Sequence, residues 1–271
     1  MGVVGMIVVA DALNIISRSG GAFASRWAHV VVGIMWIGLL YYFNFVQVPA
    51  FAEMEAAARN NALDKLAWRA LWWFRWAAAA TVVTGILILA FQPGNGAKIQ
   101  LFDMDYLKTT PGMAIATGIL LGLTMFVNVW GVIWRNQKIV IANARNVQAG
   151  GEADPAAAAA GRKAAMASRQ NAIFSFTLLM FMVGAGHFFA PTSQLGKDLG
   201  WSTSPSGGTR AGYWAFVLVI WLVLELNCLG VIGGRGPGGT NVIYDTHKAA
   251  LITGLVLVVV FYAGFYIFLK A

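Results

Sequence analysis

Two histidines lie in two different apolar runs of this 271-residue chain. His29 lies one to two helical turns into the run Ser25–Pro49, and His187 lies about one turn before the end of the run Ala172–Ala190. Two neutral imidazoles that face each other inside a helix bundle can ligate a haem iron from both sides. The pair therefore predicts a b-type haem with His29 and His187 as ligands. In the alternative interpretation, each imidazole bonds a backbone carbonyl or faces a loop.

A second group of polar residues is expected at the other membrane face. Glu225 lies within the apolar run Leu222–Asn227. A carboxylate at membrane depth costs free energy unless it is protonated or has a partner. Asn44, Arg75 and Asn128 are expected near the depth of Glu225, and Arg75 is the expected counter-charge. The favoured interpretation is a structural ion pair between the second and fifth helices, and the functional one is a proton path or a quinone or substrate pocket.

The composition places these residues in a membrane protein. Apolar residues make up 59% of the chain and charged residues 11%, whereas a soluble domain has about 25% charged residues. Six apolar runs are each near the roughly 20 residues that cross a bilayer as a helix. The sequence therefore predicts an all-α, polytopic integral membrane helix bundle with spans at about Phe23–Val48, Trp68–Phe91, Gly112–Trp134, Ala172–Ala190, Gly212–Gly233 and Lys248–Leu269.

The N-terminal residues predict a short helix in the membrane interface. Asp11, Asn14 and Arg18 recur at i, i+3 and i+7, on one helical face. The first ten residues contain no basic segment, which argues against a cleaved signal peptide. Two regions are expected: an interfacial segment at residues 1–22 and a six-helix transmembrane domain at residues 23–271.

The charges predict an orientation in the membrane. Twelve lysines and arginines flank the spans on the face opposite the N-terminus and seven on the N-terminal face, which together make the 19 of the chain. Basic residues gather in cytoplasmic loops, so both termini are expected in the periplasm of a bacterium, and the protein in its inner membrane. His29 and His187 then lie near the outer face, and His247 lies at the inner face. The net charge of +8 requires no nucleic-acid partner, since the membrane bias explains it.

Several motifs occur in the order found in one family of membrane proteins. Arg26-Trp27-Ala28-His29-Val30, Trp73-Phe74-Arg75-Trp76, Asn136-Gln137-Lys138-Ile139-Val140, and Arg169-Gln170-Asn171 leading to His187-Phe188 resemble the membrane domain of the cytochrome-c-linked urate oxidases, also called membrane-bound urate hydroxylases. The similarity extends from Arg26 to Phe189. It implies a membrane redox protein that passes electrons to a periplasmic cytochrome c, with His29 and His187 at the family's histidine positions. The fused cytochrome c domain of that family is missing up to Ala271, and the chain has no Cys-x-x-Cys-His motif for a c-type haem.

Three functions are compatible with these patterns. The first is electron transfer through haem b, from a membrane donor towards a periplasmic cytochrome c, with oxidation of a small molecule such as urate suggested by the resemblance. The second is a non-catalytic accessory subunit of a larger respiratory or photosynthetic membrane complex. The third is a transporter built around Glu225 and Arg75, which is the weakest because the sequence has no inverted repeat.

Overall fold

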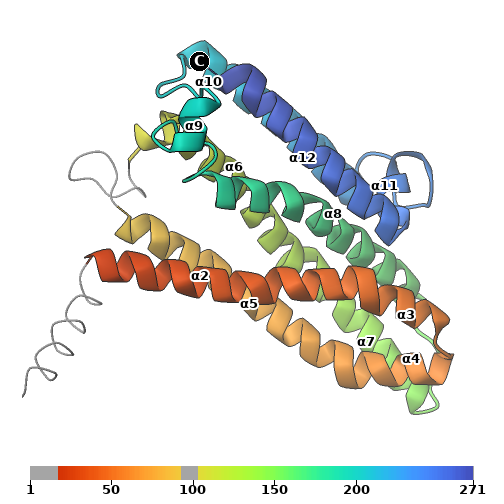
Figure 1. Cartoon of the computed structure of the whole chain (residues 1–271). Helices are drawn as coiled ribbons and strands as arrows, with labels where there is room; N and C mark the ends of the chain where they lie inside the picture. Colours follow the sequence, from red (N-terminus) through yellow and green to blue (C-terminus); the bar gives the residue numbers. More distant parts are fainter. Residues whose placement is uncertain (1–17, 93–102, 271) are drawn as a thin grey trace, which may run out of the picture.

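The computed structural model describes residues 18–92 and 103–270, and in this part of the chain it contains helices and no strand (Figure 1). Five helical segments of the described residues are long and apolar enough to cross a membrane: Ser19–Glu53, Ala56–Phe91, Thr110–Gln148, Gly207–Cys228 and His247–Leu269. The prediction of an all-α polytopic helix bundle is confirmed. Most of the predicted interfacial segment lies outside the described residues, and residues 18–22 are the first residues of the first described helix.

The first two spans pair as an antiparallel hairpin. α2 (Arg18–Tyr41) continues through the π-helical segment η1 (Tyr42–Gln47) into α3 (Val48–Glu53). Pro49 explains the π turn, because a proline ring clashes with the carbonyl four residues earlier in a regular α-helix. The return helix comprises α4 (Ala56–Ala62), a second π segment η2 (Leu63–Ala67) and α5 (Trp68–Phe91), and α5 packs along α2 (Figure 1).

The third span also contains a π segment. α6 (Thr110–Val127) begins at the capping hydroxyl of Thr109, which accepts a hydrogen bond from the Gly112 N–H. The helix continues through η5 (Asn128–Ile133) into α7 (Trp134–Gln148). A π-helical segment changes the direction in which the following side chains point, and such segments are frequent at functional sites.

α8 (Ala156–Gly184) is the central helix, and it differs from the predicted fourth span. It begins 16 residues before Ala172 and ends six residues before Ala190, so the predicted bounds are wrong at both ends. The alanine-rich start has high helix propensity, and the helix ends where the Phe189 ring packs against Gly184. α8 packs against α6, α7 and α12, and buried residues line most of its length. Because neighbouring helices enclose α8, its polar residues Gln170, Asn171 and Ser175 are buried in the protein and do not face lipid.

The last two spans cover α8 from the other side. α9 (Gln194–Asp198) leads to α10 (Gly207–Cys228), which ends five residues before the predicted end at Gly233, and α11 (Val242–Asp245) precedes α12 (His247–Leu269). Ser206 caps α10, and Thr246 caps α12. α12 approaches α8 closely at Gly254, where a Cβ would lie 2.5 Å from the Phe176 ring.

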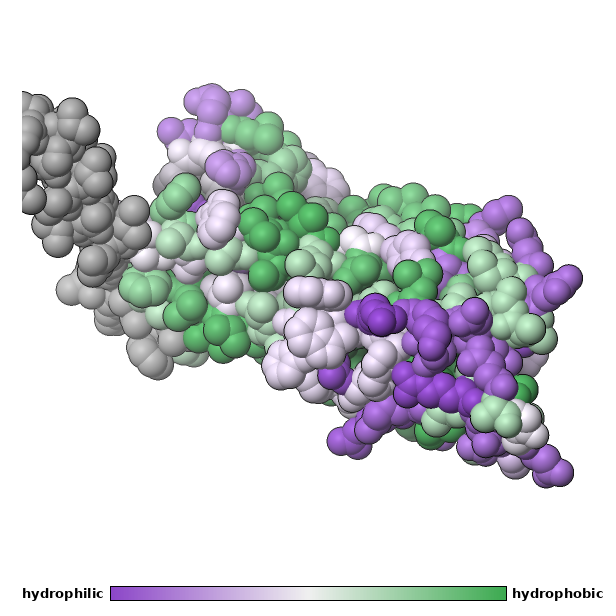
Figure 2. All heavy atoms as spheres, turned by 90° about the horizontal axis from the view of Figure 1, so that it is seen from below, coloured by the Kyte–Doolittle hydropathy of each residue, from purple (hydrophilic) through white to green (hydrophobic). Residues whose placement is uncertain are grey.

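The surface differs between the two ends of the bundle. Figure 2 shows hydrophilic residues gathered mainly at the end where α3, α4 and α7 lie, and hydrophobic residues over much of the remaining length. The polar end carries basic side chains such as Arg69, Arg145 and Arg162. The bundle therefore has an apolar body for the bilayer and one strongly basic end.

Candidate functional site

His29 lies half-buried between α2 and α5. Its Nδ1 is 3.1 Å from the Thr84 hydroxyl, and its ring fills the space beside Gly85, where a Cβ would lie 3.2 Å from the imidazole Cε1. The Thr84 hydroxyl donates its own proton to the Ala80 carbonyl at 2.7 Å. With that proton engaged, the Thr84 oxygen can accept a hydrogen bond from the His29 Nδ1–H, and in that tautomer the neutral ring has its lone pair on Nε2. An imidazole fixed through Nδ1 in this way is the usual state of a metal-ligating histidine.

His187 lies in the turn that follows α8, with its side chain exposed. The backbone around it is well fixed: the N–H groups of Phe188 and Phe189 donate to the Gly184 carbonyl, and the Ser193 hydroxyl donates to the His187 carbonyl at 2.5 Å. Phe188 and Phe189 pack into an aromatic cluster with Trp201. The backbone that carries the His187 imidazole is therefore fixed by hydrogen bonds and by aromatic packing.

The contacts between α2 and α8 determine the relative depth of the two histidines. Tyr41 bonds Ser175 at 2.9 Å, and Asn44 bonds Ser168 at 2.8 Å, so the helices are antiparallel. His29 precedes Tyr41 by twelve residues of α2, about 18 Å, whereas α8 continues nine residues beyond Ser175, about 14 Å, before the turn that contains His187. This register puts both histidines towards the same end of the bundle.

The two imidazoles do not contact each other in the described structure. Twelve residues of α-helix turn His29 by about 120° around α2 relative to Tyr41, so its ring faces α5 while Tyr41 faces α8. The cavity beside Asn44 and Gln47 and the surface pocket around Asp64 and Arg145 are lined by other residues. The structure therefore places both histidines towards one end of the bundle and gives His29 Nδ1 a hydroxyl partner, and neither of these two cavities is lined by the pair.

Glu225 and Asn128 are brought together, as the sequence predicts. The Asn128 amide donates to the Glu225 carboxylate at 3.3 Å and to Asn171 Oδ1 at 3.2 Å. The Asn171 amide in turn donates to the Met125 carbonyl at 2.9 Å. The carboxylate is thus joined to the α6–η5 helix and to α8 by neutral amides.

Arg75 is not the counter-charge of Glu225, and the predicted ion pair between them is wrong. The Arg75 guanidinium lies 3.7 Å from the centre of the Trp134 ring and 5.6 Å from that of Trp130. The indole N–H of Trp130 donates to the Arg75 carbonyl. A guanidinium stacks well on indole faces, and the sequence could not show that two tryptophans of another helix flank this arginine.

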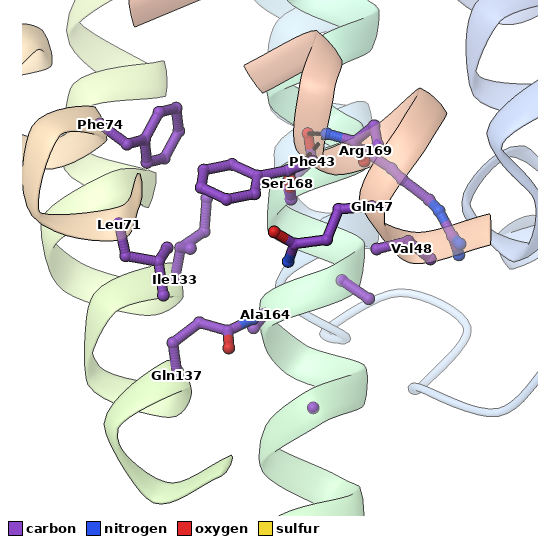
Figure 3. Close-up of a pocket in the computed structure, with 13 residues that line it drawn as sticks. Phe43, Gln47, Val48, Leu71, Phe74, Ile133, Gln137, Ala164, Ser168 and Arg169 are labelled. Carbon is purple, nitrogen blue, oxygen red and sulfur yellow. Dashed lines mark hydrogen bonds between the residues drawn. The ribbon is translucent and has the colours of Figure 1, made fainter. Parts of the chain in front are cut away.

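Asn44 lies apart from Glu225, at a cavity of about 140 Å³ between η1, α5, the η5–α7 helix and α8 (Figure 3). Its amide donates to the Leu40 carbonyl and to Ser168 Oγ. The apolar wall of the cavity consists of Phe43, Leu71, Phe74 and Ile133. The cavity was not predicted, because it depends on how four helical segments pack.

The polar wall of this cavity carries two glutamines besides Asn44. Gln47 and Gln137 line it with Ser168 and Arg169, and Figure 3 shows the Gln47 amide projecting into the space beside Phe43. Gln47 Oε1 is buried without a hydrogen-bond partner. Glutamines at membrane depth were an available signal in the sequence, and Gln47, four residues from Phe43, could have been added to the predicted polar group.

Comparison with models of protein families, with curated proteins and with solved structures finds no match for this chain. The resemblance to cytochrome-c-linked urate oxidases therefore rests on its motifs alone.

Proposed function

We propose that this protein is a membrane electron carrier in which His29 and His187 hold a b-type haem. The observation that carries the proposal is the contact of His29 Nδ1 with the Thr84 hydroxyl, which can accept the Nδ1 proton and leave the Nε2 lone pair for iron. The position of both histidines towards the same end of the bundle supports the pairing. A bound haem would supply one-electron transfer, and the protein would supply the ligands and their orientation.

We further propose the bacterial inner membrane as the location and a periplasmic cytochrome c as the electron acceptor. The basic end of the bundle fits the cytoplasmic face, which puts the histidine end outside. On this orientation both termini lie in the periplasm. Urate is the substrate that the family resemblance suggests.

The proposal is tested by the visible spectrum of the purified protein, reduced by dithionite minus oxidised. The comparison includes His29→Ala, His187→Ala and, as the matched control, His247→Ala at the first turn of α12. We expect a sharp b-type α-band in the wild type and in His247→Ala and its loss in the other two variants. Folded wild-type protein without a haem band, after expression with added haem precursor, would refute the proposal.

A second candidate function is an accessory subunit of a larger respiratory or photosynthetic membrane complex. Only 17% of the most apolar stretch of Ala56–Phe91 is buried, and the exposed side chains of α5 include Trp72, Trp73 and Trp76. Aromatic residues are enriched in protein interfaces. Co-purification of a complex from the native membrane in mild detergent, with no haem bound to this chain, would favour this function.

A further inference from the structure

We propose that the cavity between η1, α5, η5–α7 and α8 binds the ring of a small neutral aromatic molecule with a hydrogen-bond donor, of the hydroquinone class. Its residues are distinct from the two histidines of the proposed haem site. The name of the ligand class rests on the proposed electron-transfer function, because a hydroquinone is a lipid-soluble electron donor. The chemistry of the cavity itself requires only a ring with a donor group.

The requirement for a donor comes from Gln47. The side chain is 8% exposed, its Oε1 is buried, and no hydrogen bond reaches that oxygen. A buried carbonyl oxygen without a partner costs free energy that a ligand can recover by donating to it. A hydroquinone hydroxyl donates such a bond, whereas the oxidised quinone has only acceptor oxygens.

The requirement for a ring comes from the opposite wall. Phe43 and Phe74 meet edge to face with ring centres 5.4 Å apart, and Leu71 and Ile133 continue the apolar surface. The volume of about 140 Å³ is close to that of a cavity of about 150 Å³ that binds benzene. One substituted ring therefore fits, and a fused ring system or a drug-sized molecule does not.

The charges at the cavity exclude a cationic ligand. Arg169 is the one charged residue among those that line the cavity in the described structure, and its guanidinium already donates to the backbone carbonyls of Tyr244 and Asp245. A cationic ligand would find an arginine and no carboxylate. Ser168 Oγ accepts from Asn44 and keeps its own proton for a ligand oxygen.

The position of the cavity gives a ligand access from the bilayer. Val48 lines the cavity and is also 42% exposed on the outside of the bundle, at the junction of η1 and α3. The π segments η1 and η5 supply Phe43, Asn44 and Gln47 from one side and Ile133 from the other. A molecule dissolved in lipid can therefore reach the polar wall past Val48, where α3 begins near the basic end of the bundle.

Binding is tested with a decyl-substituted benzohydroquinone, kept reduced under argon, and with its quinone form, by calorimetric titration of the detergent-solubilised protein. The variants are Gln47→Met, which keeps the side-chain shape and removes the amide, and Gln148→Met as the matched control, because Gln148 is exposed at the end of α7. We expect the hydroquinone to bind at least about fivefold more tightly than the quinone, since one neutral hydrogen bond has about that value. Gln47→Met should remove this difference, and Gln148→Met should retain it.

Two results would overturn the proposal. One is the absence of saturable hydroquinone binding by the wild type, which would leave the cavity to water. The other is equal affinity of the wild type and Gln47→Met for the hydroquinone. The same titration on His29→Ala separates this proposal from the haem proposal: binding by that variant, with no haem band in any protein, would refute only the haem.

Discussion

Polar side chains bond differently in the α2–α5 hairpin and in the helices around α8. In the hairpin, the His29 imidazole bonds within the pair of helices, through Thr84. Around Asn171, polar side chains of α8 bond the α6–η5 helix, and through Asn128 they reach Glu225 of α10. Asn44 adds a contact from η1 to α8.

This difference indicates which part of the bundle holds the helices together and which part can accept a cofactor. Contacts among three or four helices fix their relative positions around Asn128 and Asn171. Around His29, α2 relies on a single partner helix, and Gly33 one turn away has open space where a Cβ would be. A large flat group could enter there at a smaller cost in packing.

The largest expected effect is that of Thr84→Val on the proposed haem site. The variant removes the acceptor of the His29 Nδ1 proton and keeps the side-chain volume. Loss of such a supporting partner weakens metal affinity by about 10- to 100-fold. Titration of the haem-free protein with haem measures this affinity, and Thr209→Val at the exposed start of α10 is the control. Unchanged affinity in Thr84→Val would contradict the assigned tautomer.

A second prediction compares two glycines. At Gly254 a Cβ would lie 2.5 Å from the Phe176 ring and 3.3 Å from the Ile173 backbone, whereas at Gly33 it meets nothing within 4 Å. We expect Gly254→Ala to destabilise the protein by about 1–3 kcal/mol through overpacking. Gly33→Ala should be neutral or stabilising by less than about 1 kcal/mol. Unfolding of both variants in detergent measures the difference, and equal loss of stability would contradict the looser packing around His29.

Asn171→Leu should give a smaller loss of stability. Asn171 bridges Asn128 and the Met125 carbonyl across two helices, whereas the amide of Asn136 bonds only within its own helix, at the Val132 carbonyl. Interhelical hydrogen bonds in membranes contribute about 0.6 kcal/mol on average and up to about 1.7 kcal/mol, and Asn171 makes two of them. We expect Asn171→Leu to cost about 1–2 kcal/mol. If Asn171→Leu lost no more stability than Asn136→Leu in the same unfolding assay, the hydrogen bonds of Asn171 would contribute little to stability.

The smallest expected effect is a pH dependence at the basic end. Hydrogen bonds from the Gly238 N–H and from Arg162 hold the pKa of Asp245 below its ordinary value. The ionised carboxylate therefore stabilises the folded protein above the ordinary pKa of about 3.9, and this contribution is lost as the pH falls below about 4. Melting temperatures from pH 7 to pH 3 should differ between wild type and Asp245→Asn at neutral pH and converge in acid. If the melting temperatures of the two proteins changed in parallel with pH, the lowered pKa of Asp245 would be contradicted.

The membrane spans could be predicted from the sequence because a helix that crosses the bilayer requires a long apolar run. The predicted span Lys248–Leu269 differs from α12 by one residue, and Trp68–Phe91 has the bounds of α5. The start of α8 was missed because Ala156–Ala160, an alanine run among glycines, has the composition of a connector as well as of a helix.

The candidate sites could be predicted only in part, because they depend on contacts between helices. The sequence placed Glu225 near Asn128, since both lie at one depth. It could not show that Arg75 stacks on Trp134, which depends on rotation of one helix against another. The cavity beside Gln47 depends in addition on two π segments, of which Pro49 marks η1, whereas no proline lies in η5 or α7.

The electron-carrier proposal is tested most directly by low-temperature electron paramagnetic resonance of the oxidised, purified protein. Two imidazole ligands make ferric haem low-spin, so we predict a low-spin signal in the wild type that is lost in His29→Ala and in His187→Ala. A protein without ferric haem signal, or a low-spin signal that persists in either variant, would contradict haem ligation by this pair.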